Sequence, residues 1–347
     1  MKLKKFARKK VTWLSDDLNS LFLSTRIRIA RNVEGFLFPN RLTSPQQLKL
    51  RGKIFQDLKK IDLLKKSLLL KMEELDTTDR RLLLERHLAS SELVFSEKIS
   101  GLLISQNEII NIMINEEDHL RIQIFGKGLE LFETLLLSQR VENEISQKIK
   151  FAYDDEFGYL TACPTNVGTG LRISFLTHLA ELVLTNHIGD VMESLSRIGL
   201  VMRGFYGEAT KPLGDFFQIS NQITLGVNPE EIIEKLLAVS RQLNDACTKQ
   251  REELLKKSRI EIEDRVFRSF AILKESRKIS FAELMQRISD IRLGLRCGFE
   301  IPVTGEKLNE IFFLSQPAHI EARAGKKLSA LQRDVLRSAF IKECLKK

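Results

Sequence analysis

The sequence predicts an α+β protein, in which an antiparallel sheet flanked by helices is followed by an all-helical C-terminal domain. Three short Ile-rich segments between residues 101 and 125 ("GLLIS", "EIINIMIN" and "HLRIQIF") are bounded by polar turn residues, which is typical of an antiparallel meander. After Gly226 this pattern gives way to successive helical patterns. The length of 347 residues suggests about two domains. We therefore expect a basic N-terminal segment (1–23), an α+β domain (24–250) and a helical domain (251–347).

Each remaining element of the α+β part has its own signal. "STRIRIAR" (24–31) alternates charged and apolar side chains, as a half-buried strand does. Residues 48–72 repeat Leu, Ile and Phe at helical spacing with Lys between them, which predicts one amphipathic helix. "IGLVMRGF" and "DFFQISNQ" predict two further strands, and the loop "YGEATKPLG" between them contains Gly207, Pro212 and Gly214 as turn signals.

The C-terminal part reads as helices throughout. Asn228 and Pro229 suit the cap and first turn of a helix, and the acids that follow them favour its N-terminus. Ser329 and Gln332 have the spacing of a capping box. The predicted helices are 229–257, 259–277, 280–297, 304–315 and 329–346.

Composition excludes several classes of protein. No apolar run approaches the roughly 18 residues of a membrane span. The basic start "MKLKKFARKK" is not followed by an apolar signal region, and four widely spaced cysteines match no zinc pattern, so we expect reduced thiols and a cytoplasmic protein. The tail supplies six of the nine net positive charges; contact with nucleic acid or an acidic partner is one interpretation, and a frayed, solvated end is the favoured one. No basic face with interleaved aromatics indicates a nucleic-acid binder.

The segment "NEEDHLRI" (115–122) places Glu116, Glu117 and Asp118 side by side and then an arginine. Taken alone, such an acidic triplet is most often a solvated turn between two strands. A second interpretation is a site that needs carboxylates, and other motifs have to decide between the two.

Several arginines have sequence neighbours that are unusual for solvated surface residues. Arg26 and Arg28 project from one face of the predicted strand with no acid nearby in sequence, so they repel each other unless an anion lies between them. Arg172 follows the loop "CPTNVGTGL", and Arg203 precedes a loop that contains Glu208. There is no Walker loop and no protein-kinase Gly-rich loop, so a triphosphate would have to bind to a cage of arginines.

Together these motifs carry a resemblance. "STRIRIARN", "NEEDHLRIQ", "YLTACPTNVGTGLR", "RGFYGE" and "ISNQITLG" occur in the order found in phosphagen (guanidino) kinases. Within that family the chain most resembles the bacterial protein-arginine kinases of the McsB type, also through "IEIEDRV" and "SDIRLGL" in the helical part. The resemblance covers residues 10 to 345 and favours the catalytic interpretation of "NEED".

The resemblance implies roles for individual residues. Arginine's guanidinium is a poor nucleophile, so a kinase must hold it and remove a proton. The family pattern makes Glu117 the base, Glu208 a second carboxylate from a mobile loop, Cys163 a thiolate that tunes the guanidinium, and Asp118 a residue that orders Mg²⁺ or its waters. Mg²⁺ is carried by ATP, with no direct protein ligand. The implied ATP-binding residues are Ser24, Thr25, Arg26, Ile27, Arg28, His87, Arg121, Arg172, Ile173, Ser174, Phe175, Leu176, Arg203, Gly204, Phe205, Tyr206, Gly207 and Glu208.

The resemblance also concerns the substrate. Small-guanidine kinases have an N-terminal lid domain before the "STR" motif, whereas here the motif starts at Ser24, so we expect arginine within a polypeptide as the acceptor. Protein-arginine kinases carry an RDxxRA motif that binds phosphoarginine and activates the enzyme. Its counterpart here is Arg333, Asp334, Arg337 and Ser338, with Ser in place of Ala; the alternative interpretation is a solvated salt-bridge pattern on one helix face.

The resemblance implies a protein-arginine kinase that marks proteins for Clp-type proteolysis or controls repressors. Its expected partners are proteins with exposed arginine, an activator of the McsA type, a Clp ATPase or protease, and further copies in a homodimer or larger oligomer. Neither nucleic acid nor a membrane is expected as a partner. Two alternatives stay open: a small-guanidine kinase and an inactive phosphoarginine-binding adaptor.

Overall fold

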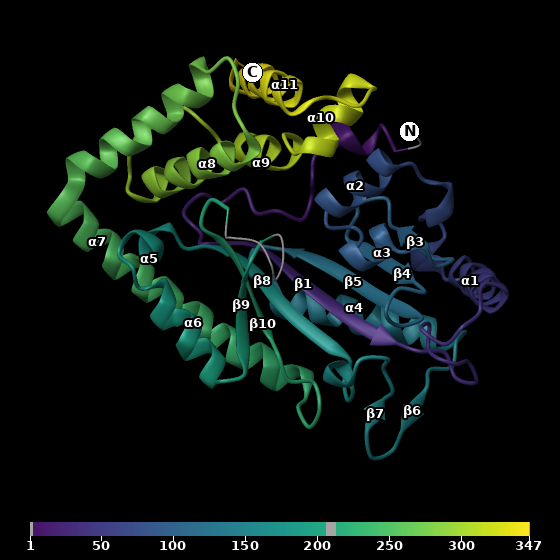
Figure 1. The fold of residues 1–347 in the computed structure, drawn as a ribbon. Helices are drawn as coiled ribbons and strands as arrows, with labels where there is room; N and C mark the ends of the chain where they lie inside the picture. The colour runs from purple at the N-terminus through teal and green to yellow at the C-terminus, as the bar shows by residue number, and fades with distance from the viewer. Residues whose placement is uncertain (1–2, 206–212, 347) are drawn as a thin grey trace.

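An eight-stranded antiparallel sheet forms the centre of the computed structural model, which describes residues 3–205 and 213–346 (Figure 1). The strands lie in the order β2-β3-β4-β5-β1-β8-β10-β9. Their bounds are β1 Phe22–Arg31, β2 Leu68–Lys71, β3 Gly101–Ile104, β4 Ile110–Ile114, β5 Leu120–Lys127, β8 Leu171–His178, β9 Leu200–Gly204 and β10 Phe216–Asn221. A separate hairpin pairs β6 (Tyr153–Asp154) with β7 (Gly158–Tyr159). The predicted α+β class is confirmed.

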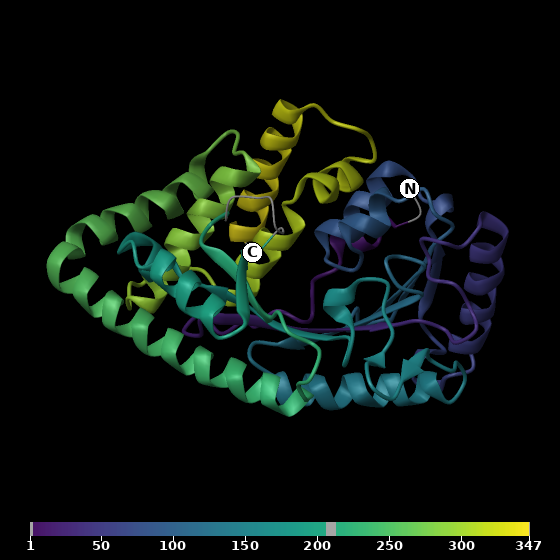
Figure 2. The same cartoon turned by 60° about the horizontal axis from the view of Figure 1, so that its bottom comes forward.

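The two faces of the sheet differ in chemistry. On one face, isoleucines such as Ile27, Ile122 and Ile173 are fully buried. They lie beneath α4 (Leu131–Ser146) and the first part of α7 (Pro229–Glu275), which run along the same side of the sheet in Figure 2. Because side chains alternate along a strand, the residues between these isoleucines point to the opposite face. On that face Phe125 of β5 and Leu176 of β8 belong to one apolar cluster with residues of the C-terminal helices.

The remaining helices lie around the sheet, and α8 to α11 form the C-terminal layer at the top of Figure 1. They are α1 Ser44–Leu58, α2 Thr77–Glu85, α3 Ser91–Phe95, α5 Ala180–Leu184, α6 Ile188–Arg197, α8 Phe281–Arg296, α9 Gly305–Leu314, α10 Pro317–Ala324 and α11 Ala330–Lys346. Short 3-10 turns are Phe6–Arg8, Asp62–Leu64, Met72–Glu74 and Pro164–Asn166.

The C-terminal helices share a core with the sheet. Phe312 of α9 stacks on Phe205 and Phe216 of the α+β part, with ring centroids 5.4 and 4.9 Å apart. Helix α7 runs through residue 250 without interruption, and its only non-helical residue is Ser258 (φ −144°). The five predicted C-terminal helices are present, with the first two joined at Ser258, and α10 is an additional helix. The proposed division at residue 250 stays a prediction.

One helix prediction was half wrong. The pattern over 48–72 predicted a single helix, but α1 ends at Leu58 and residues Leu68–Lys71 form edge strand β2. Leu69 lies opposite Leu103 and Leu70 opposite Leu102 of β3, so the leucines contribute to the sheet. Helical spacing of leucines cannot distinguish this outcome, because pairing with a strand about 30 residues away overrides local propensity.

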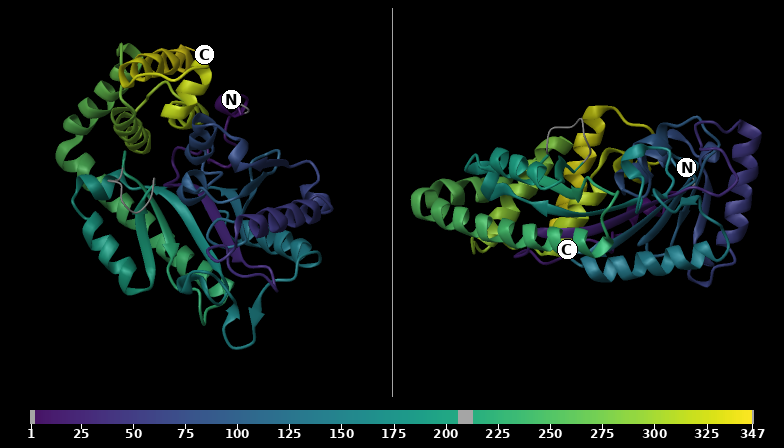
Figure 3. Two further views of the ribbon diagram at one scale, coloured as in Figure 1. Left: turned by 45° about the vertical axis from the view of Figure 1, so that its right-hand side comes forward. Right: turned by 90° about the horizontal axis from the view of Figure 1, so that it is seen from below.

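The expectation of a frayed, solvated N-terminal segment was also wrong. Leu3, Phe6 and Ala7 are buried against α2 and α10. The amide of Leu3 donates to Asp79, and the carbonyl of Ala7 accepts from Arg323. The described lysines of this segment still reach solvent, whereas the apolar residues between them pack between α2 and α10. Figure 3 shows the N-terminus beside the last helices. None of the described helices has the length and apolarity to cross a membrane.

Candidate functional site

Four arginines meet on the polar face of the central strands. Arg28 on β1 lies opposite Arg172 on β8, and the next residue on the same face, Ala30, lies opposite Arg121 on β5. Arg26 lies two residues before Arg28 on the same face of β1, and it donates to Gln218 at 2.7 Å. The predicted same-face pair Arg26 and Arg28 is thus joined by Arg121 and Arg172, and we call these four residues the arginine cluster.

The arginine cluster carries more positive charge than its surroundings neutralise. Burial, followed by the positive charges of Arg121 and Arg172, lowers the pKa of Arg26 to about 9. Burial, and then the charges of Arg26, Arg121 and Arg172, also lower the pKa of Arg28 far below its ordinary value, and Glu116 only partly opposes this. The buried Nε of Arg28 has no hydrogen-bond acceptor among the described residues. Such a cluster is suited to a ligand with several negative charges.

Glu116 balances one member of the cluster. Its buried carboxylate pairs with Arg121 and accepts from the Ser90 hydroxyl at 2.5 Å and the Glu117 amide at 2.9 Å. Burial alone would raise the pKa of Glu116, but Arg121 and these hydrogen bonds outweigh it, so the pKa lies below its usual range. Glu116 therefore stays ionised and fixes Arg121 near the start of β5.

Glu117 is the exposed carboxylate of the turn between β4 and β5. Its Oε2 lies 3.4 Å from Nδ2 of Asn166 in the "CPTN" loop. Desolvation of the carboxylate raises its pKa; Arg121 opposes this, and the negative charges of Asp118 and Glu116 add to it. A raised pKa makes a carboxylate a better proton acceptor when a substrate is held against it. Of the three acids, Glu117 alone is exposed enough to meet one.

Asp118 points inward instead. Its Oδ1 accepts from Nδ2 of Asn32 at 2.6 Å and from the amide of Ala162 at 2.7 Å, and the residue is 2% exposed. Burial raises the pKa of Asp118, while these hydrogen bonds oppose the rise. This geometry anchors the Cys163 loop to Asn32, and the expected role of Asp118 in ordering Mg²⁺ or its waters stays a prediction. The described residues contain no group of three or more side chains suited to hold a metal ion.

Cys163 begins the loop that faces Glu117. It is half-buried, and its Sγ lies 3.0 Å from the Thr165 hydroxyl. The hydroxyl of Thr224, from the "ISNQITLG" motif, donates to the carbonyls of Thr165 and Val167, which holds the loop against the end of β10. Gly168 (φ +103°) packs so closely on the Thr224 carbonyl that a Cβ would lie 2.5 Å from it. These contacts explain why the "CPTNVGTG" motif has a glycine at 168 and why the "ISNQITLG" motif has a threonine at 224.

An aromatic pocket opens beside the arginine cluster. His87 adopts φ 56° at the end of α2, where Gln123 donates to its carbonyl at 2.7 Å. Burial, and then the charge of Arg26, lowers the pKa of His87 to about 3, so its ring is neutral. We call this hollow the aromatic pocket; it is lined by Trp13, Ser24, Arg26, His87, Phe125, Ser174, Leu176, Phe205 and Gln218.

Not every residue implied by the family pattern faces this site. The side chains of Ile27, Ile173 and Phe175 are buried in the core on the opposite face, and Thr25 donates to the Gly128 carbonyl. Arg203 lies opposite Gln218 on the polar face, and Gly204 ends β9. Tyr206, Gly207 and Glu208 lie outside the described residues.

The predicted phosphoarginine-binding residues of α11 are engaged within the protein. Arg333 donates to Glu321 and to the Leu328 carbonyl, both at 3.0 Å. Arg337 is 1% exposed and donates to the carbonyls of Ser315 and Ile279, both at 2.8 Å, and to Asp334 at 2.5 Å. The Ser338 hydroxyl donates to the Ser276 carbonyl at 2.5 Å. The solvated-face interpretation was wrong for Arg337, and a ligand would have to replace these partners.

Several contributors were missed from the sequence alone. Glu116, Asn32 and Asn166 hold or orient the predicted acids, and Gln218 connects Arg26 to Ser174. Trp13 lines the aromatic pocket from a segment expected to be frayed. The motifs "ARN", "NEED", "CPTN" and "FQIS" contain four of these residues, but their hydrogen-bond partners are seen only in the structure.

Comparison with known proteins agrees with this geometry. Residues 49–249 match the ATP:guanido phosphotransferase C-terminal catalytic domain, and residues 259–347 match the protein-arginine kinase McsB C-terminal domain. A protein-arginine kinase of Halalkalibacterium halodurans is 41% identical over 350 residues, covering 100% of this chain and 98% of that protein. One of Symbiobacterium thermophilum is 43% identical over 325 residues, covering 93% and 92%.

Solved structures show the same fold. Lombricine kinase superposes with a TM-score of 0.59 at 24% identity, covering 70% of each chain. The duplicated taurocyamine kinase from Schistosoma mansoni, with bound transition-state analogue components, has a TM-score of 0.60 at 25% identity and covers 72% of this chain and 37% of that one. The resemblance inferred from the five motifs is therefore confirmed, and the chain belongs to the ATP:guanido phosphotransferase family, in its protein-arginine kinase branch.

Proposed function

We propose that this kinase transfers the γ-phosphoryl group of ATP to the guanidinium of arginine residues in proteins. The observation that carries the proposal is the arginine cluster on one sheet face, with Glu117 at the adjoining turn. Phosphoryl transfer depends mainly on positioning and charge stabilisation. The cluster supplies charge for the phosphates, and the turn supplies a carboxylate for the acceptor.

The cluster fits a nucleoside triphosphate because its charge is only partly neutralised within the protein. Arg28 has an orphaned Nε, and the pKa of Arg26 is lowered by burial and by its cationic neighbours. ATP would relieve both effects. Mg²⁺ would arrive with ATP and neutralise part of its charge, with Arg121, held by Glu116, next to the acceptor.

On the acceptor side, Glu117 is the proposed base. Its raised pKa suits removal of a guanidinium proton as the N–P bond forms. By family resemblance Cys163 would lie beside the guanidinium and Glu208 would be a second carboxylate for it. Asp118 acts through position, because it ties the Cys163 loop to Asn32.

The proposed substrates are proteins with exposed or unfolded arginine-containing segments. The names of the relatives and the McsB C-terminal match favour this class over free guanidines. The proposed setting is protein quality control in the cytoplasm, with a McsA-type activator, a Clp ATPase or protease and homo-oligomers as partners. Binding of phosphoarginine at Arg333, Asp334 and Arg337 would regulate activity, provided that the ligand displaces the internal contacts of Arg337.

One assay tests the activity. Purified protein, ATP with Mg²⁺ and casein should yield acid-labile phosphate on arginine, and free L-arginine should be a poor acceptor in the same assay. Comparable kcat/KM for both acceptors would indicate a small-guanidine kinase. Binding of a phosphoarginine peptide without any transfer would indicate the adaptor alternative.

A further inference from the structure

One edge of the sheet is strand β2, which pairs only with β3 among the described strands. The amide of Met72, directly after β2, donates to the Ser100 carbonyl at 3.3 Å. In an antiparallel pair the backbone groups of alternate residues point toward the partner strand, so those of Leu70 face β3 and those of Leu69 face away from it. No described residue forms a hydrogen bond with the backbone of Leu69 on that outer side. The edge therefore presents an unpaired N–H and C=O.

A hollow of about 460 Å³ lies along this edge, and a volume of about 300–1,000 Å³ is typical of ligand sites. Besides the strand itself, its apolar lining includes Phe55 of α1 and Leu3 of the N-terminal segment. Leu69 packs with the core that contains α1, whereas Leu70 packs with the core that contains Leu3. The hollow thus extends over both faces of the strand. An extended chain beside β2 would place its alternating side chains against both walls.

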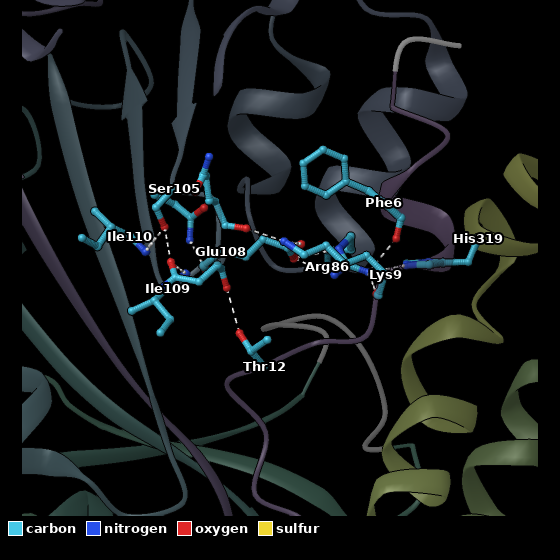
Figure 4. A network of polar contacts seen from close by, with 12 residues as sticks. Phe6, Lys9, Thr12, Arg86, Ser105, Glu108, Ile109, Ile110 and His319 are labelled. Carbon is cyan, nitrogen blue, oxygen red and sulfur yellow. Dashed lines mark hydrogen bonds and ion pairs between the residues drawn. The ribbon is translucent and has the colours of Figure 1, made fainter. Parts of the chain in front are cut away.

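Both walls of the hollow are held in place by contacts within the protein. The Phe55 ring lies so close to Gly101 of β3 that a Cβ there would be 2.7 Å from it. On the other side, Figure 4 shows Arg86 donating to the carbonyls of Phe6 (2.9 Å) and Lys9 (3.0 Å), which holds the N-terminal segment. The hollow is therefore already formed without a bound partner.

The lining of the hollow is positively charged. Lys5 and Lys59 are exposed and form no ion pair with a described residue, and Lys71 pairs with Glu74 at 3.1 Å. Lysines on an edge strand hinder pairing between two copies of a chain, because the lysines of both copies would repel one another. An acidic segment would instead be attracted to them. The charge therefore favours an acidic partner over a second copy of this chain.

We propose that the outer edge of β2 and this hollow, together called the β2 groove, bind an extended segment of another protein that alternates acidic and apolar residues. The segment would add a strand to the sheet through the backbone of Leu69, with its apolar side chains in the hollow. Strands β3 and β4 separate β2 from β5, the nearest strand of the arginine cluster, by about 14 Å at about 4.8 Å per strand. A segment bound in the β2 groove therefore leaves the proposed phosphoryl-transfer site open.

The test titrates the full-length protein with a short fluorescent probe of alternating glutamate and valine and records anisotropy. Lys5→Glu with Lys59→Glu should weaken binding about 10-fold, because two exposed attractions become two repulsions. Lys148→Glu with Lys249→Glu, a matched change of two exposed lysines outside the β2 groove, should leave the affinity unchanged. Equal affinities, or equal losses, in the two double variants would overturn the proposal.

Pairing through the backbone is tested with two N-methylated forms of the probe. One form carries methyl groups on all valine amides and the other on all glutamate amides. A strand pairs through the amides of alternate residues, so one form should lose binding and the other should retain it. Equal binding of the two forms would overturn strand addition.

A measurement without any variant locates the bound probe. The Leu69 amide faces outward, so its hydrogen exchange should slow when unlabelled probe saturates wild type. Unchanged exchange over residues 66–72 would overturn the proposal even if Lys5→Glu with Lys59→Glu does not fold. Conversion of a wild-type homo-oligomer into smaller species by the probe, seen by sedimentation, would assign the edge to a second copy and would also overturn it.

Discussion

The arginine cluster of the sheet and the arginines of α11 differ in how their charge is satisfied. Arg28 in the sheet has a buried nitrogen without an acceptor among the described residues, and burial together with its cationic neighbours lowers its pKa. Arg337 in α11 is also buried, yet it donates to two carbonyls and pairs with Asp334. The first site is suited to an added anion, whereas the second already holds the C-terminal helices together. Counting arginines therefore does not identify a phosphate site; their partners do.

The largest effect should come from the carboxylate beside the cluster. Glu117→Gln should reduce phosphoryl transfer to casein by about 10²-fold or more, the usual scale for a positioned base. ATP affinity should change little, because the arginine cluster is intact. Glu116→Gln is the comparison: it disturbs Arg121 and should weaken ATP binding as well. Near-normal turnover of Glu117→Gln would contradict its role as base.

The second prediction concerns the contribution of Arg337 in α11 to the stability of the protein. Arg337→Met should lower the free energy of unfolding by roughly 2–4 kcal/mol, because it leaves the carbonyls of Ser315 and Ile279 and the Asp334 carboxylate without their donor. Urea denaturation measures this change. A loss below about 0.5 kcal/mol, the scale of an ordinary surface substitution, would mean that the internal contacts of Arg337 are dispensable.

The third prediction concerns Arg28 in the arginine cluster, where removal of the charge should affect ATP binding and should not reduce stability. Arg28→Met should weaken ATP binding about 10- to 100-fold, the worth of one or two charge-assisted contacts. Its stability without nucleotide should be equal to or above that of wild type, because a poorly compensated buried charge is removed. Calorimetric titration and thermal unfolding of the same sample test both halves. A variant that binds ATP normally and unfolds more easily would show that Arg28 is structural.

The smallest effect concerns a carboxyl that connects α2 to the C-terminal helices. Glu85 accepts from the amides of Ala318 and His319, but burial dominates and raises its pKa to about 8. The folded state therefore binds the proton more tightly than the unfolded state, whose carboxyl has an ordinary pKa near 4.5. Stability from this group is complete below about pH 4.5 and is lost as the pH rises toward about 8.

Glu85→Gln should consequently unfold with a weaker pH dependence across that window and gain roughly 1–2 kcal/mol relative to wild type near pH 8. Glu142→Gln is a control, since that carboxylate pairs with Arg31 at another place in the molecule. Stability curves of wild type and Glu85→Gln that run parallel from pH 4.5 to 8 would show that Glu85 is ionised in the folded protein.

The local sequence pattern was enough to predict those helices and strands that bury one face and expose the other. Arg26 and Arg28 alternate with Ile27 and Ile29, and this period by itself predicts that the two arginines share one face of the strand. Apolar spacing and capping residues likewise predicted most C-terminal helices. Ordered motifs identified the family and with it the acids and arginines of the site.

Only the tertiary structure decided which groups satisfy one another. Leu69 is part of a strand because it pairs with Leu103 of β3. Phe6 is buried because it packs against apolar residues of α2 and α10. Asp118 turned inward to Asn32 and Ala162 while its neighbour Glu117 stayed exposed. The physical reason is that burial and hydrogen bonding depend on atoms contributed by distant segments, whereas periodicity records only which side of its own element a residue occupies.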